Sequence, residues 1–137
     1  MKIGVTGTRS GMTEFQKTKV KKFIAYKAII QDGFAFDKKY DPILEFHHGD
    51  CVGVDVEAAE MASEFDYRII CHPPVKDDLR AFYPYDEIRP ADTYFARNRN
   101  IVNAVDFLIV VPFQDERQNH GGTWYTHDYA KKINKRL

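Results

Sequence analysis

Cysteine is scarce in this chain, since its 137 residues include only two, Cys51 and Cys71. Two cysteines are too few for a disulfide scaffold and favour reduced thiols. No apolar run approaches the roughly 18 residues that a membrane span needs, and no secretory signal sequence is evident at the start. The chain is therefore expected to be cytoplasmic and not held in a membrane.

Net charge is also absent, because Lys plus Arg and Asp plus Glu number 20 each. A neutral chain has no general field to hold a polyanion. This argues against a nucleic-acid coat but leaves room for a local basic pocket. Apolar residues at 44% and charged residues at 29% are ordinary values for a globular protein. The length fits one domain that covers residues 1–137.

Short β-like runs alternate along the chain with stretches of helical periodicity. The expected strands cover residues 2–6, 44–47, 67–71 and 106–111, and the expected helices begin near residues 13, 54, 94 and 121. At the first helix, Thr13 and Gln16 have the spacing of a capping box. This alternation predicts a single Rossmann-like α/β domain of three layers with a short, mainly parallel sheet. We expect the strand order 3-2-1-4.

Glycine-bearing turns follow three of these strands, and in an open parallel sheet they meet at the edge where ligands bind. Glycine lets the backbone approach a phosphate, and the free N–H groups of a helix N-terminus point at it. Steric need explains any one of these turns equally well, but the three together predict a phosphate-bearing ligand. The candidate ligand-binding residues of these turns are Gly7, Thr8, Arg9, Gly49, Gly53, Gly121, Gly122 and Thr123.

Two acidic and two basic residues near the same edge add candidate chemistry. Asp50 can accept hydrogen bonds from ribose hydroxyls or act in catalysis. Asp55 lies in the first turn of its helix, where it either contacts the ligand or only complements the helix dipole. Arg97 and Arg99 are two apart on a helix, so they cannot share a face. We expect Arg97 to face the reacting or recognised centre and keep Arg99 as a candidate ligand-binding residue.

The chain resembles the SLOG superfamily, a Rossmann-like group that includes the Lonely Guy phosphoribohydrolases and the DNA-processing protein A family. The resemblance is carried by Gly7-Thr8-Arg9, residues 48–55, Arg97-Asn98-Arg99-Asn100 and Gly121-Gly122-Thr123. It extends from about residue 2 to residue 133 and is nearest to small, poorly characterised members from bacteria and phages. It implies binding or processing of a nucleotide or a nucleotide-derived signal. The hydrolases carry a glutamate where this chain has Thr126, and threonine cannot supply the negative charge that cleavage of an N-glycosidic bond needs.

The function predicted from the sequence is binding of a nucleotide or another phosphorylated ribose compound, as a sensor or a processing protein. One alternative is an N-glycosidic hydrolase of nucleoside 5′-monophosphates, with Arg97 and Asp50 as its catalytic residues. A second alternative is a DNA- or protein-interaction module on the same scaffold, although the neutral charge argues against nucleic acid. No cofactor is expected. The open edge of a short sheet favours a homo-oligomer, or else residues 32–42 cover that edge.

Three further features stay open on the sequence alone. Residues 73–93 form a long connection whose aromatic side chains either cover the ligand or pack at the sheet edge or a dimer interface. Trp124 is either a platform for a base or a core residue, and the core is favoured. The remaining candidates match no familiar metal-ligand spacing, so no metal site is expected. They are His47, His48, Cys51, Cys71 and His72.

Overall fold

The fold is described from a computed structural model, which covers residues 1–34, 44–113 and 122–137. In chain order its elements are β1 (Lys2–Gly7), α1 (Glu14–Phe34), β2 (Glu45–His48), α2 (Val54–Glu64), β3 (Arg68–Cys71), β4 (Glu87–Ile88), α3 (Tyr94–Ala104), β5 (Phe107–Val111) and α4 (Gly122–Lys132). Strands and helices alternate nearly throughout, and this confirms the α/β class.

The sheet has five strands in the order β4-β3-β2-β1-β5, and every pairing is parallel. The expected order 3-2-1-4 differs from this in one detail, the additional edge strand β4. That strand pairs Glu87 and Ile88 with the end of β3. A strand of two residues is too short to show a period-2 pattern, so the sequence predicted an irregular connection at these positions.

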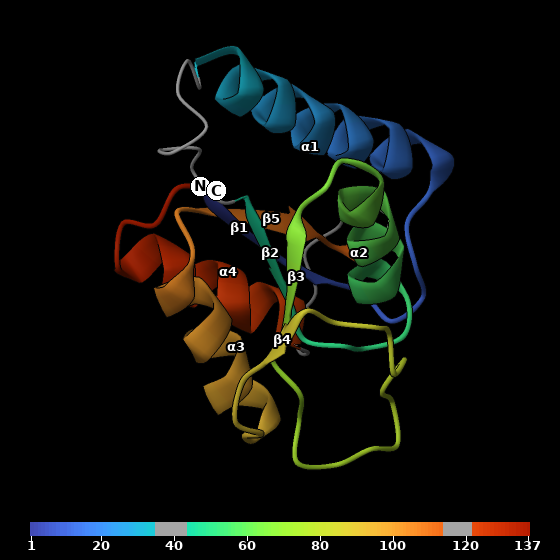
Figure 1. The fold of residues 1–137 in the computed structure, drawn as a ribbon. Helices are drawn as coiled ribbons and strands as arrows, with labels where there is room; N and C mark the ends of the chain where they lie inside the picture. Colours follow the sequence, from blue (N-terminus) through green and yellow to red (C-terminus); the bar gives the residue numbers. More distant parts are fainter. Residues whose placement is uncertain (35–43, 114–121) are drawn as a thin grey trace.

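The sheet is the middle of three layers (Figure 1), with α1 and α2 on one face and α3 and α4 on the other. A large apolar cluster joins the first face to its helices, and it includes Ile3, Phe46 and Ile24. A smaller cluster of Ile101, Val102, Leu108 and Ala130 fills the second face. Burial on both faces explains why the strands read as continuous apolar runs.

The capping box predicted for α1 is present. Thr13 N donates to Gln16 Oε1 at 2.9 Å, and Gln16 N donates to Thr13 Oγ1 at 3.1 Å. The Gln16 amide also donates from Nε2 to the carbonyl of Pro112 at 2.9 Å. The start of α1 is therefore tied to the end of β5, beside the carboxyl edge of the sheet.

The outer edge of β5 is partly covered by the end of the chain, because Leu108 N donates to the carbonyl of Arg136 at 2.8 Å. The chain ends therefore lie close together near this side of the sheet (Figure 1). Of residues 32–42, which were the other expected cover, residues 32–34 end α1 and residues 35–42 lie outside the described residues. Of the helices in the described ranges, none is both long and apolar enough to span a membrane.

Candidate ligand-binding site

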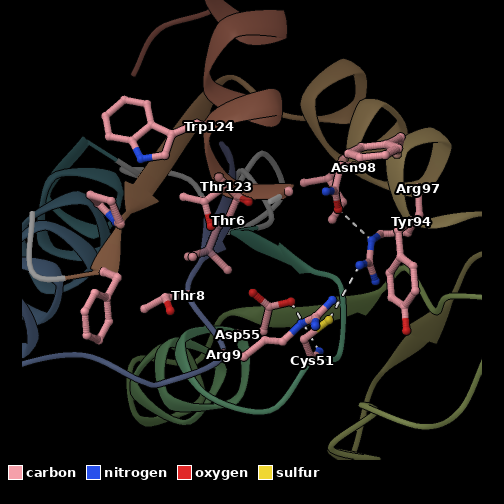
Figure 2. Close-up of a pocket in the computed structure, with 17 residues that line it drawn as sticks. Thr6, Thr8, Arg9, Cys51, Asp55, Tyr94, Arg97, Asn98, Thr123 and Trp124 are labelled. Atoms are coloured by element: carbon pink, nitrogen blue, oxygen red, sulfur yellow. Dashed lines mark hydrogen bonds between the residues drawn. The ribbon is translucent and has the colours of Figure 1, made fainter. Parts of the chain in front are cut away.

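A pocket of about 370 Å³ opens at the carboxyl edge of the sheet. It is built from the end of β1 and the turn after it, the start of α2 with the turn before it, the first half of α3, the residues that follow β5, and the first turn of α4. In Figure 2, Thr6 and Thr123 lie between Trp124 on one side and Tyr94 and Arg97 on the other. The sequence-predicted residues that line the pocket are Gly7, Thr8, Arg9, Asp55, Arg97, Gly122 and Thr123.

Other predicted residues lie outside the lining. Gly49 lies under Arg97, and a Cβ at this position would come within 2.5 Å of Arg97 Nη1. Gly53 has a φ of +90° and would meet the carbonyl of Arg9. Both glycines are therefore required by close packing and backbone conformation. Arg99 donates to the Tyr125 hydroxyl at 2.6 Å. The predicted Gly121 lies outside the described residues.

Asp50 is buried and does not line the pocket. One carboxylate oxygen accepts from Arg80 Nε at 3.0 Å, and the other accepts from the backbone N–H of Tyr83 at 3.0 Å. The Asp50 carbonyl also accepts from Ala81 N at 2.7 Å. These contacts direct Asp50 toward the long connection before α3. Asp50 therefore does not lie where it could contact a ribose in this pocket.

Asp55 is the carboxyl group that lines the pocket. Its Oδ2 atom accepts from the backbone N–H groups of Gly49, at 3.0 Å, and Cys51, at 3.3 Å. The residue is only 6% exposed. Burial raises the pKa of Asp55 to about 6, against the opposing effects of Arg97 and of the two backbone donors. From the sequence alone, Asp55 was a candidate ligand-binding residue and Asp50 was expected to have the larger role.

Arg97 is a nearly buried cation in the wall of the pocket, with 4% exposure. Its Nε donates to Asn98 Oδ1 at 2.7 Å, and its Nη1 donates to the carbonyls of Gly49 and His72. Its Nη2 lies 3.5 Å from Cys51 Sγ. All of these acceptors are neutral, and Arg97 has no ion pair with any residue in the described part of the chain.

Two guanidinium groups lie near the ring of Tyr94. The Cζ atom of Arg9 is 5.7 Å from the ring centroid, and that of Arg97 is 5.6 Å from it. Arg9 is exposed at the pocket. The ring therefore contacts an exposed arginine and a buried one beside the same ligand space.

The first turn of α4 closes the pocket from another side. A Cβ at Gly122 would come within 2.9 Å of Asn98 Nδ2, so a larger residue where α4 meets α3 would require the Asn98 amide to move. Asn98 in turn accepts from Arg97, which links this turn to the guanidinium. Thr126 is buried and donates to the carbonyl of Gly122 at 2.6 Å. The Thr126 hydroxyl thus serves the helix backbone, and Thr126 is not part of the lining.

Aromatic side chains form much of the remaining wall, and among them is Trp124, for which a platform for a base was one of the two alternatives from the sequence. Tyr94, Phe95, Phe113 and Trp124 all line the pocket. No residue of the 73–93 connection does so, although it was considered as a cover for the ligand. Trp124 is half-buried and faces the pocket, so the favoured interpretation as a core residue was wrong.

The buried histidines form a network outside the pocket. His47 Nδ1 lies 2.8 Å from His72 Nε2, and His47 Nε2 lies 2.9 Å from Glu45 Oε1. Burial lowers the pKa of His72 to about 3 and that of His48 to about 4, so both rings are neutral near pH 7. Within the described ranges, no group of three or more His, Cys, Asp or Glu residues is arranged to hold a metal ion.

Comparison with known proteins finds structures with a similar fold but does not assign the chain to a family. No protein-family model and no curated protein matches the chain. One similar solved structure is the molybdenum cofactor binding protein from the phototrophic bacterium Rippkaea orientalis. It has 19% identity and a TM-score of 0.68, and the match covers 98% of this chain and 72% of that one. Another is the structural-genomics target TM1055, with 15% identity, a TM-score of 0.55, and coverage of 98% and 70%. Both show that this Rossmann-like arrangement occurs in other proteins.

Proposed function

We propose that the pocket binds a nucleotide or another phosphorylated ribose compound. The observation that carries this proposal is the Arg97 guanidinium, which is 4% exposed and bonded only to neutral acceptors among the described residues. Asp55 attracts Arg97 electrostatically but forms no direct ion pair with it. A buried charge without a direct ion pair is costly, and an anionic ligand would compensate it further. The Rippkaea protein, a molybdenum cofactor binding protein, supports a small-molecule ligand on this fold.

The neutral groups of the pocket suit a phosphate. The first turn of α4 presents backbone N–H groups that have no partner within the helix, and these favour an anion. The hydroxyls of Thr6, Thr8 and Thr123 line the same space. We assign the phosphate to this region and the sugar to Asp55, because a carboxylate accepts hydrogen bonds from hydroxyls but repels phosphate.

Titration calorimetry with ribose 5-phosphate and a panel of nucleoside 5′-monophosphates tests the proposal. Replacing Thr123 by Ala removes one donor to a charged group and should weaken binding by about tenfold. The matched control is Thr18→Ala, because Thr18 is exposed on α1 and bonds only its own helix. If a probe binds and Thr123→Ala leaves its affinity unchanged, the phosphate does not lie at α4. If no probe binds to the folded protein, the proposal is wrong.

A second candidate function is N-glycosidic cleavage of a nucleoside 5′-monophosphate, and the position of Asp55 favours it. The carboxylate could stabilise positive charge on the sugar as the bond from C1′ to the base nitrogen breaks. Water would then form the new bond to C1′ and lose a proton, which the departing base nitrogen gains. Asp55 takes the role that the sequence analysis gave to Asp50, and Arg97 stays the assisting residue.

Liquid chromatography of released base distinguishes this activity from binding alone. Asp55→Asn should abolish release while ribose 5-phosphate still binds. Asp50→Asn is the matched control, because Asp50 lies five positions earlier but bonds Arg80 instead of lining the pocket. Loss of release in Asp50→Asn with full activity in Asp55→Asn would reverse the assignment. No release across the panel would leave a binding protein.

A further inference from the structure

The side chain of Arg9 is the feature of the pocket that the proposed function leaves unused. It lines the pocket from the turn after β1, and it is exposed. The turn itself is fixed, because Thr8 N donates to the carbonyl of Val111 at 3.0 Å. The backbone of Arg9 also packs so closely on Gly53 that a Cβ there would come within 2.4 Å of the Arg9 carbonyl oxygen. The guanidinium thus extends from a well-packed backbone, and within the described ranges it forms no ion pair.

Arg97 reaches the same end of the pocket from α3. Its Cζ atom and that of Arg9 lie 5.6 and 5.7 Å from the centroid of the Tyr94 ring. Among the described residues, Arg97 Nη2 has no oxygen acceptor and contacts only Cys51 Sγ, at 3.5 Å. Burial raises the pKa of the Cys51 thiol, and the charges of Arg97 and Arg9 oppose this rise. Both cations therefore act on the space around Cys51 (Figure 2).

The charged groups of the lining do not balance. Its described residues include two cations, Arg9 and Arg97, and one carboxylate, Asp55. The Oδ2 atom of that carboxylate already accepts from two backbone N–H groups. The first phosphate is assigned to the neutral N–H groups and hydroxyls near α4, so it does not use the guanidinium groups. A second anionic group is therefore needed to complement the positive charge at this end.

We propose that Arg9 and Arg97 form a second anion subsite, so that the pocket takes a ribose compound with two separate phosphate groups. The proposal rests on the proposed function, which puts the first phosphate at the first turn of α4 and the sugar at Asp55. Cys51 links the second subsite to the sugar, because its N–H donates to Asp55 while its sulfur contacts Arg97. The second phosphate therefore belongs on the sugar ring. A remaining ring hydroxyl donates to Asp55, and the two guanidinium groups bind the phosphate.

Two kinds of compound have this chemistry. A nucleoside 3′,5′-bisphosphate keeps its base, whereas in ribose 1,5-bisphosphate the second phosphate takes the place of the base. A nucleoside 5′-diphosphate does not have it, because its second phosphate extends from the first one and not from the sugar ring.

Titration calorimetry compares each bisphosphate with its own monophosphate. Adenosine 3′,5′-bisphosphate is paired with adenosine 5′-monophosphate, and ribose 1,5-bisphosphate with ribose 5-phosphate. In at least one pair the bisphosphate should bind about tenfold more tightly, which is the usual worth of one hydrogen bond between charged groups. The pair that shows this gain identifies the kind of compound. Adenosine 5′-diphosphate should show no comparable gain over adenosine 5′-monophosphate.

Substitution of Arg9 assigns the gain to the subsite. Arg9→Ala should reduce it to less than about threefold, and Arg9→Lys should keep most of it, because the charge is retained. A thermal scan checks that both variants fold. Arg68→Ala is the matched control, because it removes the same charge from an exposed arginine at the start of β3, at the opposite edge of the sheet. This control should keep the full gain.

The possible results separate this inference from the function beneath it. Monophosphates that bind as tightly as both bisphosphates would overturn the second subsite and leave the proposed function standing. A gain that Arg9→Ala leaves intact, or an equal gain with adenosine 5′-diphosphate, would also overturn the subsite. A gain that depends on the charge at position 9 and is absent for the diphosphate would establish it. A folded protein that binds none of these compounds would overturn both proposals.

Discussion

Replacing Asp55 by Asn should make the protein more stable near neutral pH, although it removes the carboxylate that we place at the ligand. The Asn side chain keeps an oxygen that can accept from Gly49 N and Cys51 N, as Oδ2 of Asp55 does. It no longer carries a charge that burial disfavours. The gain in stability therefore measures what the native carboxylate costs the fold.

The magnitude follows from the raised pKa of Asp55. A rise from 3.8 to about 6 corresponds to about 3 kcal/mol, at about 1.4 kcal/mol for each tenfold change in proton affinity. The folded state holds the proton more tightly than the unfolded state. The contribution of Asp55 to stability is therefore fully present below about pH 4 and is lost as the pH rises to about 6. This net value already includes the attraction of Arg97, which opposes the rise.

Urea unfolding of both proteins at pH 7.5 and at pH 4 is the assay. The variant should exceed the native protein by about 1–3 kcal/mol at pH 7.5, and the difference should nearly vanish at pH 4. Asp78→Asn is the control, because Asp78 is exposed and its replacement should change neither value. A variant that is less stable than the native protein at pH 7.5 would refute the reasoning. The attraction between Asp55 and Arg97 would then outweigh the cost of burial.

Three other substitutions test the packing around the site. Gly49→Ala should displace the Arg97 guanidinium, lower the melting temperature by several degrees in a thermal scan, and weaken binding of ribose 5-phosphate in calorimetry. Arg80→Ala leaves Asp50 buried without its cation and should cost about 3 kcal/mol in urea unfolding, while Arg80→Lys should recover part of it. Thr126→Glu puts a charge at a position that is 1% exposed. It should destabilise the fold by several kcal/mol and produce no base release in the chromatographic assay.

Much of the fold follows from patterns only a few residues long. The capping box of Thr13 and Gln16 predicts where α1 begins, and apolar runs with glycine turns predict four of the five strands. The separation of Arg97 from Arg99 follows from helix geometry alone. Each of these features depends on neighbours in the sequence, so the sequence is enough to predict it.

The details of the site depend on partners that are distant in the sequence. Asp50 and Asp55 follow the same strand, and no local pattern distinguishes them. Asp50 has a φ of 58° and pairs with Arg80, 30 residues later. These two facts direct its carboxylate away from the pocket. Likewise, Trp124 faces the pocket because α4 meets α3 at Gly122, a contact that only the assembled fold provides.

The pocket draws on residues from Val5 to Trp124, which are contributed by five separate segments of the chain. No fragment and no partly folded state contains all of them, so a ligand of this pocket binds the native state alone. By mass action, a compound at 100 times its Kd would add about 2.7 kcal/mol to the free energy of unfolding. Thermal denaturation in the presence of a metabolite collection therefore becomes a search for the ligand. It needs no prior assumption about the chemistry, and the melting temperature of the protein is its only readout.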